Sequence, residues 1–407
     1  MNSRHIVIVG GGAAGFFAAI TAAEASPEAQ VTLLERGAQV LAKVRISGGG
    51  RCNVTHACFE AREFATRYPR GGKALIGPFQ RFQARDTVAW FAARGVTLKT
   101  ERDGRMFPVT DDSATIVACL TNAAQRAGVV VKTNCGVDCV VRTEGGFELT
   151  LTGGGKIGAD RLLLATGGCR AAAAGQMATA LGHTIEPPVP SLFTFQIELP
   201  WLKELAGASV EVAEVSVPET DLRECGPVLV THWGLSGPAV LRLSAWGARQ
   251  LHDLNYQFPL RVNWLPGVTP EKLTAEIQAR RQTQGARLLV NAPIAPLSAR
   301  LWEALVQAAG LNRETRWAAL PRAQQQQLIQ QLTRTEFAVT GKSLNKDEFV
   351  TCGGVKLAEV NFKTMESRIS PGLYFAGELL DIDGITGGFN FQAAWTTGWI
   401  AGHAMAA

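Results

Sequence analysis

A glycine-rich turn close to the amino terminus has the spacing of a dinucleotide-binding site. The apolar run 5–9 leads directly into Gly10, Gly12 and Gly15, and a stretch of small residues follows. In this pattern Gly10 permits a tight turn, Gly12 lets the backbone approach a pyrophosphate, and Gly15 lets a helix pack close to the preceding strand. The start of that helix would offer bare N–H groups and a positive dipole end to phosphates.

A carboxylate stands where such a site needs one. The second apolar run, 31–34, ends on Glu35, which lies twenty residues after Gly15. At that distance a carboxylate can accept hydrogen bonds from a ribose diol. The order strand, glycine turn, helix, strand and acid therefore predicts a βαβ dinucleotide site. The glycines of 153–158 fall in a predicted meander turn instead, so we expect a single site of this kind.

Two further glycine-rich segments favour FAD over NAD as the bound dinucleotide. The segment 43–53 contains a triple glycine and has no apolar periodicity, which indicates a loop against a planar ligand. A second glycine turn, 166–168, follows the buried strand predicted over 161–165. FAD extends across the sheet and needs backbone clearance at several strand ends. We therefore expect one FAD, held without a covalent bond.

The carboxy-terminal segment supplies the remaining parts of this predicted site. Residues 377–381 place an acid near the end of a strand, where it can accept a hydrogen bond from a ribityl or phosphate-linked hydroxyl group. Residues 387–392 open the last predicted helix. The positive end of this helix would stabilise charge on the N1/O2 edge of a reduced flavin and make the flavin a better electron acceptor.

The residues predicted to contact the cofactor come from all of these segments and from two neighbouring positions, 36 and 137. They are Gly10, Gly12, Ala13, Ala14, Gly15, Glu35, Arg36, Lys43, Ser47, Gly49, Gly50, Arg51, Cys52, Asn53, Val137, Thr166, Gly167, Gly168, Gly377, Glu378, Asp381, Gly388, Asn390, Phe391 and Gln392.

Three residues are the catalytic candidates, and for each of them a purely structural role is the alternative. Arg51 and Asn53 follow the triple glycine and could line the reactive face of the flavin, where Arg51 could stabilise an anionic reduced flavin or a substrate carboxylate. His232 lies in the polar loop 231–238 and could donate a proton. His56 has a similar claim. Cys52 could be a nucleophile or charge-transfer thiol, but no cysteine at CxxxxC spacing accompanies it.

These segments predict an α/β fold with a Rossmann-like FAD-binding domain, a small β-meander and an inserted domain. The FAD-binding domain is expected over 1–189 and 346–407. The insertion, 190–345, is β-rich over 190–266 and helical over 267–345. Predicted elements of the FAD-binding domain include helices over 80–95, 113–127, 171–181 and 391–404 and meander strands over 129–133, 137–142 and 147–152.

The composition is that of an ordinary folded protein. Of 407 residues, 46% are apolar and 18% are charged, and the net charge of +5 does not by itself call for nucleic acid or an anionic membrane. No run approaches the ~20 apolar residues that span a bilayer, and the first apolar run already serves as a strand, so we expect neither membrane association nor a signal peptide. The eight cysteines form no CxxC pair and the six histidines are scattered, which predicts reduced thiols, a cytoplasmic location and no metal site.

Several segments together resemble a known family. They are Gly10–Gly15, Ser47–Thr55, Gly104–Pro108, Ala165–Gly168, Thr231–Pro238, Thr364–Ser367 and Gly372–Gln392. They resemble the bacterial BaiN/YhiN-type NAD(P)/FAD-dependent oxidoreductases, also called the aminoacetone oxidase family, over essentially the whole chain. The resemblance implies FAD, a glutathione-reductase-like FAD domain and an inserted β-plus-helical domain.

The predicted function is that of an FAD-dependent oxidoreductase with a small-molecule substrate. It would move a hydride between NAD(P)H, as a transient reductant, or a small organic substrate and flavin N5, in a cleft between the FAD domain and the insertion. The resemblance alone suggests reduction of a carbon–carbon double bond. A third possibility is that FAD serves as a structural group or redox sensor without turnover.

The alternative from another class is a flavin-dependent tRNA-modifying or RNA-binding protein. Its support is a basic stretch with interleaved aromatic residues. The basic residues are Arg62, Arg67, Arg70, Lys73, Arg81 and Arg85. Such a run is usually a solvated helical face, so no nucleic-acid partner is expected.

Overall fold

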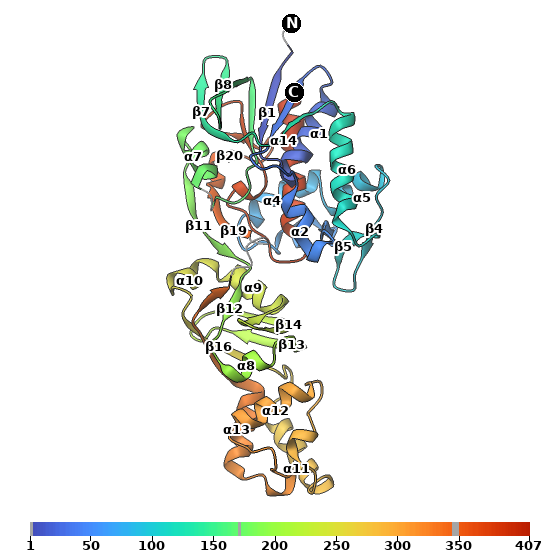
Figure 1. The fold of residues 1–407 in the computed structure, drawn as a ribbon, viewed down its shortest axis with the longest axis vertical. Coiled ribbons are helices and arrows are strands. Elements are labelled where there is room, and N and C mark those ends of the chain that lie inside the picture. The colour runs from blue at the N-terminus through green and yellow to red at the C-terminus, as the bar shows by residue number, and fades with distance from the viewer. Residues whose placement is uncertain (1–2, 170–171, 344–349) are drawn as a thin grey trace. The chain divides into compact units, whose positions relative to one another are not determined.

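The computed structural model describes residues 3–169, 172–343 and 350–407, and Figure 1 shows their ribbon. The chain divides into two compact units. The first unit is Met1–Ser191 with Asn345–Ala407, and the second unit is Leu192–Leu344. That these units are domains with boundaries at 189/190 and 345/346 stays a prediction.

A seven-stranded sheet with the order β20-β21-β22-β10-β1-β2-β6 forms the centre of the first unit. The strands from β22 to β6 run parallel, and β20 and β21 extend one edge in antiparallel pairing. The central strands are apolar and buried, as is typical of parallel sheets covered on both faces, and the predicted α/β class is confirmed. The seven strands are β1 (His5–Val9), β2 (Gln30–Leu34), β6 (Val130–Lys132), β10 (Arg161–Leu164), β20 (Val360–Asn361), β21 (Glu366–Ser367) and β22 (Leu373–Phe375).

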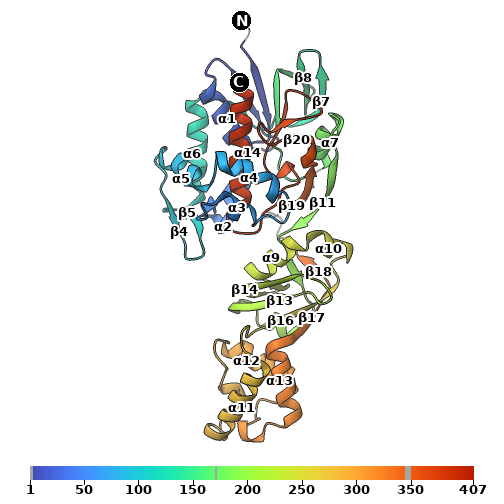
Figure 2. The ribbon, with the colours of Figure 1, turned by 180° about the vertical axis from the view of Figure 1, so that it is seen from behind.

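Helices from the two ends of the chain pack directly against each other on this sheet. Helix α1 (Ala13–Ala25) and helix α14 (Phe389–Ala406) lie side by side in Figures 1 and 2. A Cβ atom at Gly398 would lie 2.5 Å from the carbonyl oxygen of Ala14, and one at Gly402 would lie 2.6 Å from that of Ala18. Glycine is therefore needed at both positions for the two backbones to come this close.

The predicted helix over 113–127 is confirmed by α6 (Ser113–Arg126), whereas the prediction of one helix over 80–95 is confirmed only in part. Two helices stand there, α4 (Gly72–Arg81) and α5 (Ala84–Ala92), because the backbone is extended at Phe82 and Gln83. The Asp86 carboxylate in the first turn of α5 accepts a hydrogen bond from Gln83 N at 2.8 Å, which begins a new helix at this point.

Two other local predictions need correction. The loop expected over 43–53 is helical in its first part, as α2 (Ala42–Gly50), with a kink at Ser47. The meander consists of β7 (Val137–Thr143), β8 (Gly146–Leu151) and β9 (Lys156–Ala159). The segment 129–133, predicted as a meander strand, instead contributes β6, which pairs with β2 at the sheet edge. Alternating polarity is common to both kinds of half-exposed strand, so it could not distinguish them.

The other elements of the first unit surround this core. A three-stranded sheet has the order β3-β5-β4, and β11 pairs with β19 in antiparallel fashion. These elements are β3 (Thr55–His56), α3 (Ala61–Ala65), β4 (Leu98–Thr100), β5 (Arg105–Pro108), α7 (Ala172–Ala180), β11 (Ile185–Ser191), β19 (Val350–Val355) and the short 3-10 turns η3 (Leu357–Glu359) and η4 (Gly377–Leu379).

The second unit has a seven-stranded sheet with the order β17-β16-β13-β14-β15-β12-β18, whose neighbouring strands are all antiparallel. Its strands are β12 (Thr194–Gln196), β13 (Ser209–Ser216), β14 (Arg223–Thr231), β15 (Gly234–Ser236), β16 (Phe258–Asn263), β17 (Thr335–Val339) and β18 (Gly341–Ser343). Its helices are α8 (Pro200–Glu204), α9 (Pro238–Trp246), α10 (Ala248–Asp253), α11 (Pro270–Thr283), α12 (Ala299–Ala308) and α13 (Arg322–Arg334), with 3-10 turns η1 (Leu289–Asn291) and η2 (Trp317–Ala319).

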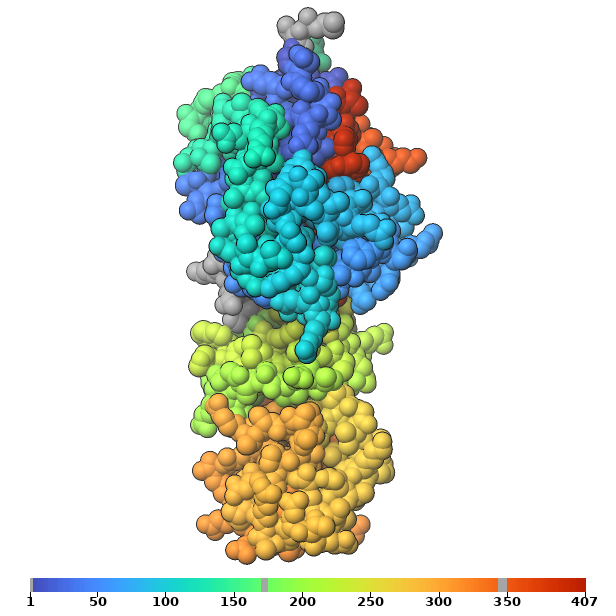
Figure 3. All heavy atoms as spheres, turned by 90° about the vertical axis from the view of Figure 1, so that its right-hand side faces the viewer, coloured from blue at the N-terminus to red at the C-terminus, as the bar shows by residue number. Residues whose placement is uncertain are grey.

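One hydrophobic core runs through the second unit, from its sheet into its helices. Trp264 and Phe337 on the sheet side and Trp302 and Trp317 on the helical side all belong to it. Figure 3 shows the surface of the helices of this unit in gold and orange. Within the described residues of both units, none of the helices has the length and apolar character needed to span a bilayer.

A buried ion pair fixes the loop that precedes α14 in the first unit. The carboxylate of Asp383 has no exposed surface and accepts two hydrogen bonds from the Arg70 guanidinium. It also accepts one from Ser191 Oγ at 2.8 Å. Burial raises the pKa of Asp383, and the hydrogen bonds from Arg70 and Ser191 oppose that effect. The loop is therefore held by a charge pair that depends on both partners.

Replacing Asp383 by asparagine should destabilise the protein strongly. Asp383→Asn leaves the largely buried Arg70 cation without its counter-ion, so we expect the free energy of unfolding to fall by about 3 kcal/mol. Glu148→Gln, which breaks the exposed Lys156 pair, is the control and should leave the urea midpoint unchanged. Equal urea midpoints for the two variants would show that the buried Arg70–Asp383 pair stabilises the protein no more than the exposed Lys156–Glu148 pair.

Candidate functional site

The glycine turn between β1 and α1 has the close contacts that its sequence pattern predicts. Gly10 has a φ of +114°, and a Cβ atom there would lie 2.3 Å from the carbonyl oxygen of Ala165. A Cβ atom at Gly15 would lie 2.0 Å from the carbonyl oxygen of Gly10. A Cβ atom at Gly12 would meet nothing within 4 Å. The turn is therefore packed tightly against its own neighbours and open on the side where α1 begins.

The start of α1 is free to receive an anion. Gly12 is the N-cap residue and brings no side chain to the first N–H groups of the helix, and the first turn contains no acidic residue. Ala13 and Ala14 follow as the first helical residues. Bare N–H groups next to open space are what a pyrophosphate requires, so these residues fit the predicted dinucleotide.

Glu35 lies beside this turn, and both of its carboxylate oxygens accept backbone hydrogen bonds. One oxygen accepts from Gly11 N at 2.8 Å and the other from Gly37 N at 2.7 Å. A carboxylate oxygen can accept more than one hydrogen bond, so a ribose hydroxyl could still be bound by Glu35. Arg36 is exposed next to it, and Val137 is buried at the start of β7. Their contacts with a cofactor stay predictions.

The second glycine turn follows β10, which is the neighbour of β1 in the sheet. Thr166 Oγ1 is buried and has no hydrogen-bond partner in the described residues. A Cβ atom at Gly167, where φ is +78°, would meet nothing within 4 Å, whereas one at Gly168 would lie 2.2 Å from Thr351 Oγ1. An orphaned buried hydroxyl beside open space is the sign of a missing polar ligand, and FAD fits it.

The carboxy-terminal segment meets the first glycine turn directly. A Cβ atom at Gly377 would lie 2.9 Å from the Cβ atom of Ala14, and Gly377 N donates to Thr397 Oγ1 on α14 at 2.9 Å. Glu378 accepts from Thr351 N at 2.8 Å and from Lys43 Nζ at 2.6 Å. The structure therefore brings together these parts of the predicted cofactor site, which lie more than 300 residues apart in the chain.

Lys43 and Glu378 were both predicted to contact the cofactor, and their ion pair was not foreseen. Asp381 follows in the half-buried part of the same loop, and its N–H donates to the carbonyl oxygen of Val355. The role of Thr351, which joins Glu378 to the second glycine turn, was missed because no motif surrounds it.

The start of α14 is held in place by polar side chains. Asn390 accepts from Gly384 N and donates to the carbonyl oxygen of Gly384, both at 2.8 Å. A Cβ atom at Gly388 would lie 2.5 Å from the carbonyl oxygen of Thr55. Phe391 stacks on Trp395 with ring centres 5.6 Å apart. These contacts fix the orientation of the first turn of α14, where the positive end of the helix dipole lies.

Gln392 is fully buried, and its bonds tie distant parts of the first unit together. Its Oε1 accepts from Thr55 Oγ1 at 2.6 Å and from Thr87 Oγ1 at 2.9 Å, and its Nε2 donates to Thr396 Oγ1 at 3.1 Å. These bonds use both the oxygen and the nitrogen of the side-chain amide. Its predicted cofactor contact stays a prediction.

The triple glycine forms a kinked end to α2. The backbone leaves the helical region at Ser47, and Gly49 and Gly50 have positive φ angles with open space where a side chain would stand. Arg51 then donates to Glu101 at 2.7 Å, and its guanidinium lies 4.0 Å from the centre of the Phe107 ring. The hydrogen bond to Glu101 raises the pKa of Arg51, which is charged at neutral pH in any case.

Asn53 joins this segment to α14. In the amide orientation that satisfies both atoms, its nitrogen donates to the carbonyl oxygen of Thr55 at 3.1 Å and its oxygen accepts from Gly388 N at 3.0 Å. Asn53 and Arg51 therefore lie in one segment of the first unit. His232 lies in the exposed turn between β14 and β15 of the second unit. The catalytic roles of all three stay predictions.

His56 is a neutral side chain next to the start of α14. Its ring stacks on Phe389 with centres 4.7 Å apart, and its Nδ1 lies 3.1 Å from the carbonyl oxygen of Gly387. Since a carbonyl only accepts, Nδ1 carries the proton in this bond. Burial lowers the pKa of His56. At neutral pH its Nε2 therefore carries a lone pair.

Among the other histidines, His183 is a packing residue. Its ring is buried and bonded to Glu359 and Ser367, and burial lowers its pKa.

The thiol of Cys52 should be inert in the folded protein. Cys52 is fully buried, and burial raises its pKa to about 12, so it is protonated at neutral pH. We expect it to resist a disulfide-exchange reagent until the protein unfolds, whereas the exposed Cys139 reacts at once. Mass spectrometry of the labelled peptides tests this, and rapid labelling of Cys52 in the native protein would contradict it.

Filling the open space at Gly12 should remove the cofactor without unfolding the chain. In Gly12→Val, the added side chain enters the space expected for the pyrophosphate, so we expect FAD to bind at least ~10-fold more weakly, a loss of about 1.4 kcal/mol or more. Gly158→Val adds the same side chain to open space on β9 and should bind FAD normally. Titration with FAD, followed by flavin fluorescence, measures the affinity of both variants. Normal affinity in Gly12→Val would contradict the prediction that the pyrophosphate binds at Gly12.

Comparison with known proteins identifies the family of this chain. The family model described as the HI0933-like protein Rossmann domain matches residues 4–404. A ribosomal RNA dihydrouridine synthase of Escherichia coli is 32% identical over 98% of this chain and 97% of its own length. A 3-dehydro-bile acid delta(4,6)-reductase of Clostridium scindens is 29% identical over 99% of each chain.

The fold is also that of a solved flavoenzyme structure. The 3-ketosteroid-delta4-(5alpha)-dehydrogenase of Rhodococcus jostii RHA1 superimposes with a TM-score of 0.54 at 15% identity, over 99% of this chain and 97% of that one. At this identity the likeness concerns the fold alone. The family match, which spans nearly the whole sequence, is the stronger result: the chain belongs to the HI0933-like, BaiN/YhiN-type family of FAD-binding Rossmann proteins and is a flavin-dependent oxidoreductase.

Proposed function

We propose that this protein reduces a carbon–carbon double bond conjugated to a carbonyl group, and that its substrate is a uridine of ribosomal RNA. The substrate rests on one observation, the 32% identity over nearly full length to a protein named ribosomal RNA dihydrouridine synthase. A second protein of that name, from Haemophilus influenzae, is 28% identical over 97% of this chain. A flavin-dependent tRNA-modifying or RNA-binding protein was the alternative in the sequence analysis, and these relatives favour an RNA substrate over a small molecule.

The names of the relatives describe one type of chemistry. Dihydrouridine differs from uridine by two hydrogen atoms across the C5–C6 bond, which is conjugated to the C4 carbonyl group. A delta(4,6)-reductase of a 3-oxo compound likewise saturates a double bond conjugated to a ketone. Each product needs one hydride and one proton, and bound FAD supplies hydride chemistry at N5.

The residues of this chain would hold and polarise the cofactor. The open start of α1 would bind the pyrophosphate, and Thr166 Oγ1 would gain the partner that it lacks. The start of α14, fixed by Asn53 and Asn390, would face the N1/O2 edge and stabilise negative charge there. NADH or NADPH is the proposed reductant.

A small enone is the second candidate substrate. The 29% identity to the delta(4,6)-reductase, over 99% of each chain, favours it. The two candidates share the flavin site and the reaction type and differ only in substrate size. Turnover with each substrate therefore separates them.

Anaerobic assays should show both half-reactions. We expect NADH or NADPH to bleach the flavin absorption band, and the reduced protein to convert uridine to dihydrouridine in ribosomal RNA transcribed in vitro from the same organism. Nucleoside mass spectrometry detects the product, and Gly12→Val is the cofactor-deficient control. Bleaching without dihydrouridine, together with turnover of a 3-oxo-4,6-diene bile acid, would replace RNA by the small enone.

A further inference from the structure

We propose that the helical part of the second unit, residues 267–334, is the surface that binds the phosphates of the RNA. We call this segment the helical module; it contains α11, α12 and α13. The inference rests on the proposed ribosomal RNA substrate and adds the part of the chain where that partner docks, whereas the predicted flavin-binding residues all belong to the first unit.

The net positive charge of the protein is concentrated in this module. Nine lysine and arginine residues and four glutamates lie within 267–334, so the module has a net charge of +5. The whole chain has 40 basic and 35 acidic residues, so the remaining 31 of each sign cancel. An excess of positive charge on one part of a protein is the electrostatic footprint of a nucleic-acid partner.

Most of these cations are not neutralised by the protein itself. Arg280 pairs with Glu276, and Arg313 pairs with Glu303. No carboxylate of the described residues pairs with the other seven. Three of them donate only to backbone carbonyl oxygens: Arg281, Arg287 and Arg300. The rest are exposed: Lys272, Arg316, Arg322 and Arg334.

Three of the unpaired arginines come together where two segments of the module pair. Trp317 N donates to the carbonyl oxygen of Arg287 at 3.1 Å, and Leu288 and Arg316 form a β-bridge. Arg281 on α11 reaches the same place, because its guanidinium donates to the carbonyl oxygen of Ala318 at 3.4 Å. The backbones around Arg287 and Arg316 are therefore neighbours, and Arg281 reaches the same part of the module; we call these three residues, drawn from three parts of the sequence, the arginine cluster.

Acidic residues are sparse in the sequence around this cluster, where Glu276 is paired with Arg280 and Glu314 is the nearest other carboxylate. No acidic residue occurs over 277–302 or over 315–335. The exposed polar positions of α13 include Gln326, Gln327 and Gln330, which can hydrogen-bond without adding negative charge. Eight of the nine cations are arginines, whose planar guanidinium matches phosphate oxygens in pairs.

The chemistry of the module favours RNA over a membrane surface. Among the described residues, the exposed large apolar side chains all lie outside 267–334. A membrane-binding surface would need apolar side chains to insert below the headgroups. The module instead keeps its leucine and tryptophan side chains in the core of the second unit.

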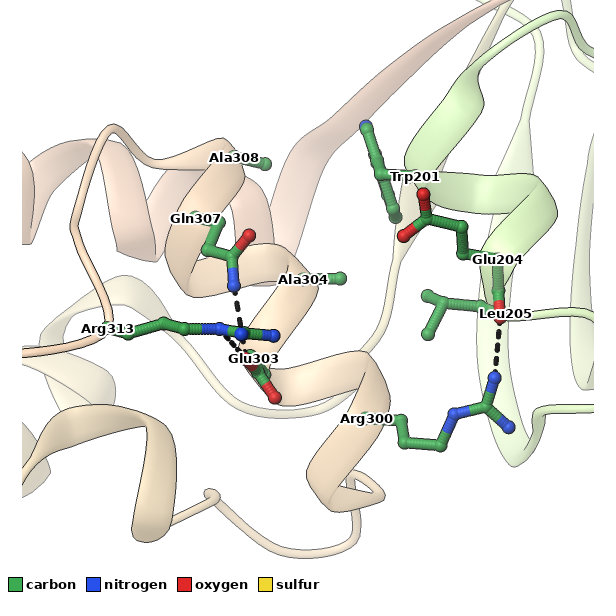
Figure 4. Close-up of a pocket in the computed structure, with 9 residues that line it drawn as sticks. All are labelled: Trp201, Glu204, Leu205, Arg300, Glu303, Ala304, Gln307, Ala308 and Arg313. Carbon is green, nitrogen blue, oxygen red and sulfur yellow. Dashed lines mark hydrogen bonds and ion pairs between the residues drawn. The ribbon is translucent and has the colours of Figure 1, made fainter.

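Two other regions fit an RNA backbone less well. In the basic stretch of the first unit, Arg70 is buried against Asp383 and Arg67 pairs with Glu63. In the second unit, a pocket of about 400 Å³ lies between α8 and α12 (Figure 4). Its two arginines, Arg300 and Arg313, are balanced by two glutamates, so it has no excess charge.

Neutralising the cluster should weaken RNA binding while leaving the flavin site intact. In the full-length holoprotein, Arg281→Gln/Arg287→Gln/Arg316→Gln should bind ribosomal RNA transcribed in vitro at least ~10-fold more weakly at moderate salt. The slope of log K against log salt should fall by about 2, because three phosphate contacts are lost at roughly 0.7 each. The same three positions changed to lysine keep the charge and should retain most of the affinity.

Matched variants separate this surface from a general loss of charge or of folding. Arg62→Gln/Lys73→Gln/Arg85→Gln removes equal charge from the first unit and should bind RNA normally. Lys272→Gln/Arg322→Gln/Arg334→Gln changes exposed cations of the module that make no side-chain bonds in the described structure, and it should also weaken binding. Flavin absorption and bleaching by NADPH should stay normal in all of them.

The outcomes distinguish this inference from the proposed substrate. If the wild type makes dihydrouridine and both module variants bind RNA and turn over with unchanged KM, the module is not the docking surface, although the substrate stands. If the wild type neither binds nor modifies RNA, the substrate proposal fails first and this inference with it. Retention on anionic phosphatidylserine vesicles without RNA binding would also overturn it.

Discussion

The close approach of α1 to α14 is the constraint on which the rest of the first unit depends. Gly398 and Gly402 carry no side chains, so the backbones of the two helices touch at Ala14 and Ala18. Gly377 also packs against Ala14, so the segment before α14 meets the start of α1 as well. A larger residue at Gly398 or Gly402 of α14 would push the start of α14 away from the glycine turn at the start of α1.

Buried hydrogen bonds of polar side chains fix the position of the start of α14 in the first unit. Gln392 on α14 accepts hydrogen bonds from Thr55 and Thr87, and Asn53 binds the backbone at Gly388. Each of these groups would be costly to leave unpaired inside the protein. The start of α14 is therefore oriented before any cofactor binds, and preorganised dipoles act more strongly than groups that must reorient.

The sequence predicted what is local and missed what depends on distant partners. The strand, glycine turn, helix and acid from His5 to Glu35 follow from spacing alone, and each of them is present. In contrast, the bond of Arg51 to Glu101 joins residues 50 positions apart, and no local pattern indicates it. The break at Phe82 was hidden because apolar spacing continues across it. The family shows the cofactor, whereas the choice among Arg51, Asn53 and His232 as catalytic residues stays a prediction.

The strands that leave and re-enter the first unit are partners in one antiparallel ladder. Val189 of β11 stands opposite Cys352 of β19, and Ser191 stands opposite Val350. Ser191 and Val350, which flank the second unit in the sequence, are thus neighbours, and each doubling of the length inserted between them costs only about 0.6 kcal/mol of chain entropy. The first unit can therefore keep its own fold when the inserted unit changes in length or sequence. Changes in what the protein recognises need not disturb the scaffold that carries its redox chemistry.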